Sequence, residues 1–164
     1  MTCAAERPLL FLDVDGPLIP FGTPTGRPQG AAVDTGNPLL TRLVPGIGTR
    51  LLALGCDLVW ASTWMSEAND VVGPRVGLPT LPVVQWPDAE GEEGPQGLHW
   101  KTRALVEWAG GRPFVWVDDE IGGIDRQWVA ACHPGPALLH RVDPAEGLTE
   151  VDLATLARWL RTIT

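Results

Sequence analysis

The amino-acid sequence predicts a three-layer α/β domain with a mostly parallel sheet of about five strands. Its 164 residues fit one domain, so we expect a single domain over residues 1–164. Hydrophobic residues make up 45% of the chain and charged residues 20%, which is ordinary for a folded globular protein. Short apolar runs alternate with helical segments from end to end. This alternation is typical of a parallel sheet covered by helices on both faces.

The first predicted strand, residues 8–16, is an apolar run that ends in two aspartates and a glycine. A continuous apolar run favours a central parallel strand that is buried on both faces. Residues 16–38 contain five glycines and five prolines among 23 residues, which predicts a loop and excludes a helix. We expect a short extended piece at 39–44, followed by a helix over 45–54 that ends at Gly55.

The remaining elements are predicted by the same criteria. Further strands are expected at 56–61, 81–84, 113–117 and 137–142. Helices are expected at 64–72, 100–109 and 124–132, and residues 86–99 read as a solvated loop because acids stand there among glycine and proline. The last helix should begin at Thr149, because Thr149 and Asp152 form the spacing of a capping box.

Composition excludes several classes of protein. The net charge of −8 argues against tight non-specific binding of nucleic acid, which depends on basic surface. No apolar run approaches the ~20 residues of a membrane span, and the N-terminus lacks a basic signal region, so we expect a cytoplasmic protein without a membrane partner. The three cysteines are odd in number and far apart, which indicates reduced thiols. The three histidines lack zinc-site spacing.

Polar side chains follow the predicted strands where ligands bind in an open parallel sheet, beyond the carboxyl ends of the strands. Each of these residues alone is more often a helix cap, a turn former or a surface residue. Their joint occurrence in one order is much less frequent by accident. They are Asp13 and Asp15 after the first strand, Ser62 and Thr63 after the second, Lys101 at the start of a helix, and Asp118 and Asp119 after the fourth.

These residue types point to phosphate chemistry with a metal ion. Carboxylates that converge on one site repel one another unless a cation is present, and oxygen ligands favour Mg²⁺. The candidate metal ligands are therefore Asp13, Asp15, Asp118 and Asp119. A lysine and a hydroxyl beside the ion would bind a phosphoryl group. The chain has eleven arginines and only one lysine, which suggests that position 101 needs a compact ammonium.

The motif at Phe11–Gly16, an apolar strand followed by Asp-Val-Asp-Gly, resembles the first motif of the haloacid-dehalogenase-like (HAD) phosphohydrolases. Ser62 resembles their second motif, Lys101 the third, and Val117-Asp118-Asp119 the acidic fourth, in the family's order over residues 8–130. The run 58–64, with Glu67-Ala68-Asn69 after it, also resembles the small HAD domains that are grouped with bacterial RNA-repair proteins. The resemblance implies a Rossmann-like, HAD-like domain.

The resemblance also implies roles for the residues. Asp13 would be the nucleophile that forms an aspartyl-phosphate, and Asp15 would protonate the leaving oxygen and then activate water. Lys101 and Ser62, with Thr63 as the alternative hydroxyl, would bind the phosphoryl oxygens. Asp118 and Asp119, with Asp13, would hold Mg²⁺, and Asp125 is a candidate outer partner of the metal.

The sequence departs from the family pattern at two places, where Pro17 follows Gly16 and where the fourth motif reads Asp-Asp-Glu. The gaps 16–38 and 73–99 are too short for a folded cap domain, so we expect a capless enzyme with an open site. Such a site suits a phosphate on a large substrate, for example a nucleotide or a nucleic-acid end. Three tryptophans flank the predicted site, where packing or stacking on a base would explain them: Trp64, Trp86 and Trp100.

The sequence therefore predicts a Mg²⁺-dependent phosphohydrolase that acts on a phosphomonoester. Two alternatives come from other classes of protein. A receiver-type signalling module also uses acids, a hydroxyl and a lysine on a parallel sheet, but there the phosphate acceptor follows a middle strand, and residues 84–85 offer no acceptor. A catalytically silent HAD-like binding domain ranks last, because no residue of the predicted site is missing.

Overall fold

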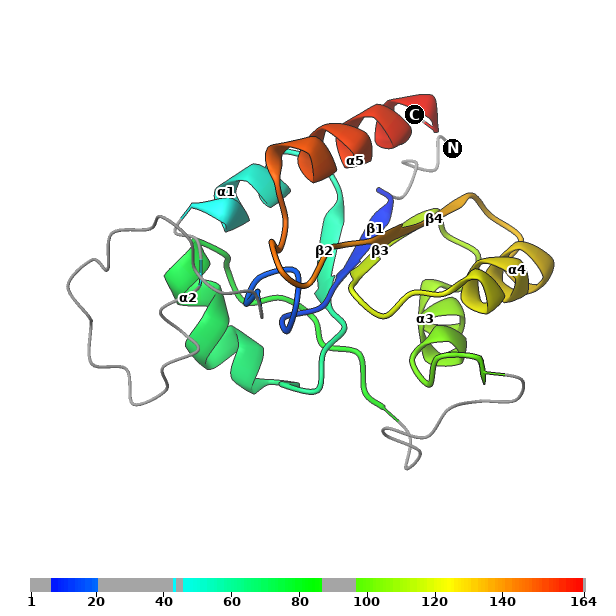
Figure 1. Ribbon diagram of the computed structural model, residues 1–164, viewed down its shortest axis with the longest axis horizontal. Helices are drawn as coiled ribbons and strands as arrows, with labels where there is room; N and C mark the ends of the chain where they lie inside the picture. The colour runs from blue at the N-terminus through cyan, green and yellow to red at the C-terminus, as the bar shows by residue number, and fades with distance from the viewer. Residues whose placement is uncertain (1–6, 21–42, 44–45, 87–96, 164) are drawn as a thin grey trace, which may run out of the picture.

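A four-stranded, all-parallel sheet forms the centre of the computed structural model, which describes residues 7–20, 43, 46–86 and 97–163 (Figure 1). The strands lie in the order β2-β1-β3-β4. This architecture confirms the predicted α/β fold class. The strand bounds are β1 Leu9–Leu12, β2 Asp57–Trp60, β3 Phe114–Asp118 and β4 Ala137–Arg141.

Helices cover both faces of the sheet, which gives three layers (Figure 1). α1, η2, α2 and α5 pack on one face, and α3 and α4 on the other. None of the helices in the described part of the chain is long and apolar enough to cross a membrane. The helix bounds are α1 Ile47–Leu52, the π-helix η2 Ala68–Val72, α2 Gly73–Val76, α3 Thr102–Ala109, α4 Gly123–Cys132 and α5 Glu150–Thr162.

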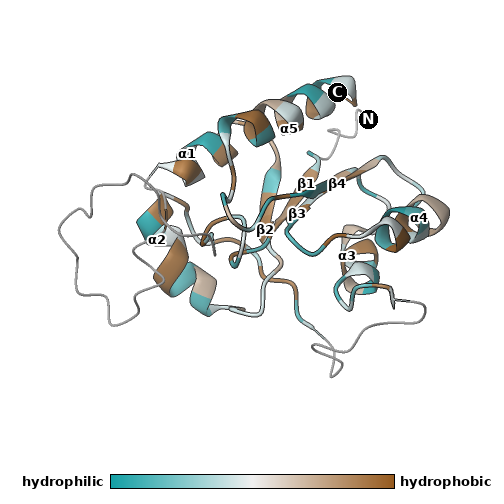
Figure 2. Ribbon diagram, viewed as in Figure 1, coloured by the Kyte–Doolittle hydropathy of each residue, from teal (hydrophilic) through white to brown (hydrophobic). Residues whose placement is uncertain are grey.

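Each strand contributes side chains to two separate hydrophobic cores, because successive residues of a strand point to opposite faces. In β1, Leu10 and Leu12 pack in the core beneath α1 and α5. Leu9 and Phe11 pack in the core beneath α3 and α4. Figure 2 shows the strands as predominantly apolar. This two-sided burial is the reason why the strands read as continuous apolar runs in the sequence.

The predicted strand at 81–84 is reduced to one bridge, so the sheet of the described residues has four strands where about five were expected. Val83 bridges Trp60, whose N–H donates to Pro82 O at 2.9 Å and whose carbonyl accepts from Val84 N at 3.0 Å. Pro82 has no N–H to donate. The side-chain amide of Asn69 bonds to both the N–H and the carbonyl of Leu81, at 2.8 Å each, so Leu81 cannot extend the ladder. The extended piece expected at 39–44 lies outside the described residues, apart from Leu43.

Two predicted helix boundaries have different outcomes. The helix expected at 64–72 continues through α2 to Val76, because Pro74 sits in the first turn of α2, where an N–H has no intrahelical partner. The capping box at the start of α5 is confirmed. Asp152 N donates to Thr149 Oγ1 at 3.3 Å, and Thr149 N donates to Asp152 Oδ2 at 2.8 Å.

Candidate active site

The end of the central strand β1 places Asp13 between the ends of its two neighbours. Asp13 N donates to Val117 O at 3.1 Å, and Ala61 N donates to Leu12 O at 2.8 Å. The ladder thus continues one residue beyond β1 on the side of β3, and one residue beyond β2 on the other side. Gly16 then turns the chain with a φ of +103°. A Cβ at this position would lie 2.7 Å from Cγ of Asp119, so only glycine lets the loop after β1 approach the loop after β3 this closely.

Three carboxylates meet at this edge of the sheet. One oxygen from each of Asp13, Asp118 and Asp119 lies within 4.8 Å of the other two. Asp13 and Asp118 are buried, and Asp119 is half-buried. Among the described residues, Asp15 is not part of this group. An oxygen-only donor set of this kind fits a hard divalent cation such as Mg²⁺.

The lone lysine of the chain is buried against two of these carboxylates. Lys101 Nζ lies 2.8 Å from Asp118 Oδ2 and 3.2 Å from Asp13 Oδ1. The rings of Trp86 and Trp100 are in contact with each other and lie near the same ammonium, with their centroids at 5.9 and 5.5 Å from Nζ. Lys101 is only 4% exposed, so a larger guanidinium fork at this position would have to displace its neighbours. The structure therefore gives a physical reason for lysine at this position.

The segment that carries Lys101 is fastened to the loop after β3. The His99 ring accepts a hydrogen bond from Lys101 N at 3.1 Å through Nδ1, and its Nε2 lies 2.8 Å from Glu120 Oε2. Because Nδ1 accepts, Nε2 carries the proton and donates to Glu120. The role of His99 was not predicted from the sequence, where the only signal is a histidine two residues before the lone lysine.

Asp125 has a structural role in this connection. Its carboxylate accepts hydrogen bonds from His99 N at 2.8 Å, Thr102 Oγ1 at 2.8 Å and Gly122 N at 2.9 Å. These three donors occupy the carboxylate, and Asp125 lies outside the group of Asp13, Asp118 and Asp119. These bonds make Asp125 a clamp between the start of α3 and the start of α4, and its role as an outer partner of the metal stays a prediction.

The carboxylates of Asp13, Asp118 and Asp119 carry more negative charge than the Lys101 ammonium balances, which favours a second cation. Burial raises the pKa of Asp13 well above its usual range, and the charge of Asp118 adds to this, although Lys101 opposes it. Burial and the hydrogen bond and charge of Asp118 raise the pKa of Asp119 to about 6. Burial acts against the charged form of Asp118 too, but the Lys101 ammonium outweighs burial and holds that pKa below its usual range. One ammonium therefore leaves this group of carboxylates short of positive charge.

Lys101 itself remains a cation. Burial lowers the pKa of its ammonium, but the charges of Asp13 and Asp118 outweigh burial, so the net shift is upward. The ammonium is thus available to a negatively charged ligand at neutral pH.

The hydroxyls and Asp15 lie on neighbouring segments. Ser62, two residues after the end of β2, is fully buried, whereas Thr63 is exposed. Ser62 Oγ accepts from Trp64 N at 3.2 Å, and its carbonyl accepts from Trp86 Nε1 at 3.0 Å. Asp15 is half-buried, and its Oδ2 accepts from Trp64 Nε1 at 3.2 Å. All three tryptophans predicted to flank the site thus contact candidate site residues or the segment that carries them.

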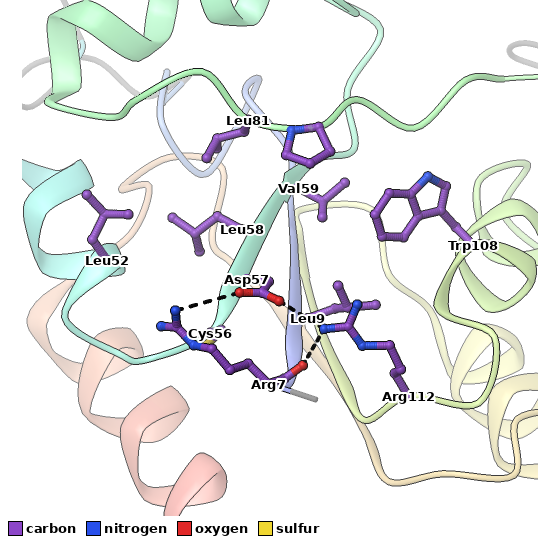
Figure 3. Close-up of a pocket in the computed structure, with 11 residues that line it drawn as sticks. Arg7, Leu9, Leu52, Cys56, Asp57, Leu58, Val59, Leu81, Trp108 and Arg112 are labelled. Carbon is purple, nitrogen blue, oxygen red and sulfur yellow. Dashed lines mark hydrogen bonds and ion pairs between the residues drawn. The ribbon is translucent and has the colours of Figure 1, made fainter. Parts of the chain in front are cut away.

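A separate cavity of about 380 Å³ is lined by none of the predicted site residues (Figure 3). It lies beside the first residues of β1 and β2, Leu9 and Asp57, away from the carboxyl ends of the strands. Asp57 forms ion pairs with Arg7 at 3.7 Å and with Arg112 at 2.9 Å at its edge. Trp108 is 39% exposed on the wall of this cavity. In parallel sheets ligands bind at the carboxyl edge, which singles out the aspartate cluster.

Comparison with known proteins identifies the family. A family model described as "HAD domain in Swiss Army Knife RNA repair proteins" matches residues 9–153. A search of curated proteins and a search of solved structures each gave no match. The matched region contains the aspartate cluster, Lys101 and Ser62, and it confirms the resemblance found in the sequence. The chain therefore belongs to the family of HAD domains of Swiss Army Knife RNA repair proteins.

Proposed function

We propose that this domain is a Mg²⁺-dependent phosphohydrolase that cleaves a phosphomonoester through an aspartyl-phosphate on Asp13. The observation that carries the proposal is the placement of the buried Asp13 carboxylate at the end of the central strand. There Asp13 lies 3.2 Å from the Lys101 ammonium and beside Asp118 and Asp119. A nucleophilic carboxylate needs positive charge around it to approach a phosphoryl group. Lys101 supplies one positive charge, and Asp118 and Asp119, with Asp13, would hold a cation that supplies more.

In the proposed reaction, an oxygen of Asp13 attacks phosphorus, and the bond from phosphorus to the leaving oxygen breaks. Asp15 gives its proton to that oxygen and then accepts a proton from the water that hydrolyses the aspartyl-phosphate. Inorganic phosphate leaves, and both carboxylates return to their starting states. Lys101 and Ser62 bind the phosphoryl oxygens. Mg²⁺, held by Asp13, Asp118 and Asp119, would supply further positive charge to the same oxygens.

We propose a phosphorylated nucleotide or nucleic-acid end as the substrate class. The family takes its description from RNA repair proteins, which supports a phosphate at the end of a nucleic acid. The net charge of −8 provides little general attraction for a polyanion. We therefore expect recognition to be confined to the terminal phosphate and its neighbours, with a weak dependence of KM on salt.

The test is a panel of phosphomonoesters assayed for phosphate release with Mg²⁺ and with EDTA. The panel contains 3′- and 5′-phosphorylated oligonucleotides, nucleoside monophosphates and p-nitrophenyl phosphate. We expect turnover that EDTA abolishes, because the carboxylates repel one another without the ion. Asp13→Asn should abolish turnover, whereas Asp57→Asn, which changes a carboxylate at the opposite end of the sheet, should leave the activity intact.

Asp15→Asn separates the two chemical steps. This variant should still form the phospho-enzyme from p-nitrophenyl phosphate, whose leaving group needs little protonation, but should hydrolyse it slowly. Mass spectrometry should then find the phosphate on Asp13. Wild-type activity of Asp13→Asn, or phosphate on Asp118 or Asp119, would refute the assignment. A lasting phospho-aspartate in the wild type without turnover would favour the receiver alternative.

A further inference from the structure

The geometry points to Trp64 as a positioning residue that holds the Asp15 carboxylate in place for proton transfer to the leaving group. This inference rests on the proposed phosphatase function. Trp64 Nε1 donates to Asp15 Oδ2 at 3.2 Å across 49 positions of the sequence. The backbone N–H of Trp64 donates to Ser62 Oγ at 3.2 Å. One residue thus connects the proposed acid/base to the proposed phosphate-binding hydroxyl.

The indole is itself held in place by the fold. Trp64 is half-buried and packs against the hydrophobic core beneath α1, α2 and α5. It stands in the turn between β2 and η2, so its backbone is set by the end of an edge strand of the sheet. Asp15, in contrast, lies on the half-buried loop after β1. A fixed donor beside a carboxylate on a loop restricts the rotamers that the carboxylate adopts.

The chemistry of indole suits this role. The Nε1–H group is a donor only, so it bonds to one oxygen of Asp15 without taking up or releasing the proton that Asp15 must transfer. The other carboxylate oxygen then remains for the leaving group. A general acid acts only when it lies within hydrogen-bond reach of the oxygen that it protonates, so orientation of Asp15 controls the rate.

The competing interpretation is that Trp64 serves only to fill the core. Trp64→Phe distinguishes the two interpretations, because it keeps an aromatic ring and removes the N–H group. Trp159→Phe is the matched control. Trp159 on α5 is also half-buried and packs against the same core, so both variants lose a similar amount of buried surface.

The experiment compares phenyl phosphate with p-nitrophenyl phosphate, two substrates of similar shape whose leaving oxygens differ in basicity. The more basic phenolate depends more strongly on protonation. For Trp64→Phe we expect kcat/KM on phenyl phosphate to fall about tenfold, and kcat/KM on p-nitrophenyl phosphate to fall less than about threefold. The quantity compared is kcat/KM, because it reports the step in which the leaving group departs and not the later hydrolysis of the aspartyl-phosphate, which is the same for both substrates. Trp159→Phe should affect both substrates equally and little. In an Asp15→Asn background, Trp64→Phe should cause no further loss, because the two residues act through one carboxylate.

Three results decide the matter. The selective loss on phenyl phosphate, together with non-additivity in the Asp15→Asn background, supports the role of Trp64. Equal effects of Trp64→Phe and Trp159→Phe on both substrates, or full additivity with Asp15→Asn, overturn it and leave the phosphatase proposal intact. A wild-type protein that hydrolyses no member of the phosphomonoester panel refutes the phosphatase proposal and, with it, the proposed role of Trp64.

Discussion

Replacement of Lys101 by methionine removes the ammonium that separates Asp13 from Asp118. Its Nζ lies 3.2 Å from one carboxylate and 2.8 Å from the other. At an effective dielectric constant of about 20, each contact is worth roughly 5 kcal/mol of Coulomb energy, much of which offsets the cost of burying the charges. Removal of one partner of a buried ion pair typically destabilises a protein by about 3–5 kcal/mol. We expect Lys101→Met to lower Tm by roughly 10 °C.

The assay is thermal and urea denaturation of Lys101→Met at pH 7, pH 5 and pH 3. Arg103→Met is the matched control, since Arg103 is an exposed cation two residues further along the chain, in α3. Its loss should change stability by at most about 0.5 kcal/mol. Lys101→Arg should not restore full stability, because the guanidinium keeps the charge but is larger than the ammonium that this buried site holds.

The pH dependence has a defined sign. In the wild type the Lys101 ammonium outweighs burial and holds the pKa of Asp118 below its usual range. A lowered pKa in the folded state contributes stability above the unfolded pKa, and this contribution is lost as the pH falls through the folded pKa. The difference between wild type and Lys101→Met should therefore stay nearly constant from pH 7 to pH 5 and narrow below about pH 4. A Lys101→Met protein as stable as Arg103→Met at pH 7, or a difference that widens at pH 3, would refute the reasoning.

Three further predictions concern the same site. Mg²⁺ should raise Tm more at pH 7.5 than at pH 5, because the pKa of Asp119 is raised to about 6 and protons therefore compete with the ion in acid. Thermal denaturation with and without Mg²⁺, with EDTA as the control, measures this, and a larger increase of Tm at pH 5 would contradict it. Gly16→Ala should destabilise more than Gly55→Ala and should weaken the response to Mg²⁺. Both glycines have positive φ, but only at position 16 would a Cβ meet another side chain, so equal losses in urea denaturation would argue against the close approach. His99→Phe should cost about 1–3 kcal/mol of unfolding free energy in the same assay, because Lys101 N–H loses its acceptor, and an unchanged value would show that the bond is dispensable.

The local pattern of the chain was sufficient to predict most of the elements. β1, β2 and β4 lie within the predicted strand ranges, and β3 exceeds its range by one residue, Asp118. Burial of both faces makes these strands continuous apolar runs. The capping box of α5 was also predictable, since its two partners are only three residues apart. The failures occurred where a distant group intervened. The side chain of Asn69 takes the backbone groups of Leu81, and no pattern within 81–84 reveals that.

For the candidate site, the sequence by itself determined which residue types follow which strands and in what order. Only the tertiary structure decided that the order β2-β1-β3-β4 puts β1 in the middle, so that Asp13 meets Asp118 and Asp119. It also decided that Ser62 is buried while Thr63 is exposed. The physical reason is that strand runs, caps and turns depend on neighbouring residues, whereas strand order and side-chain contacts depend on pairings between segments far apart in the chain.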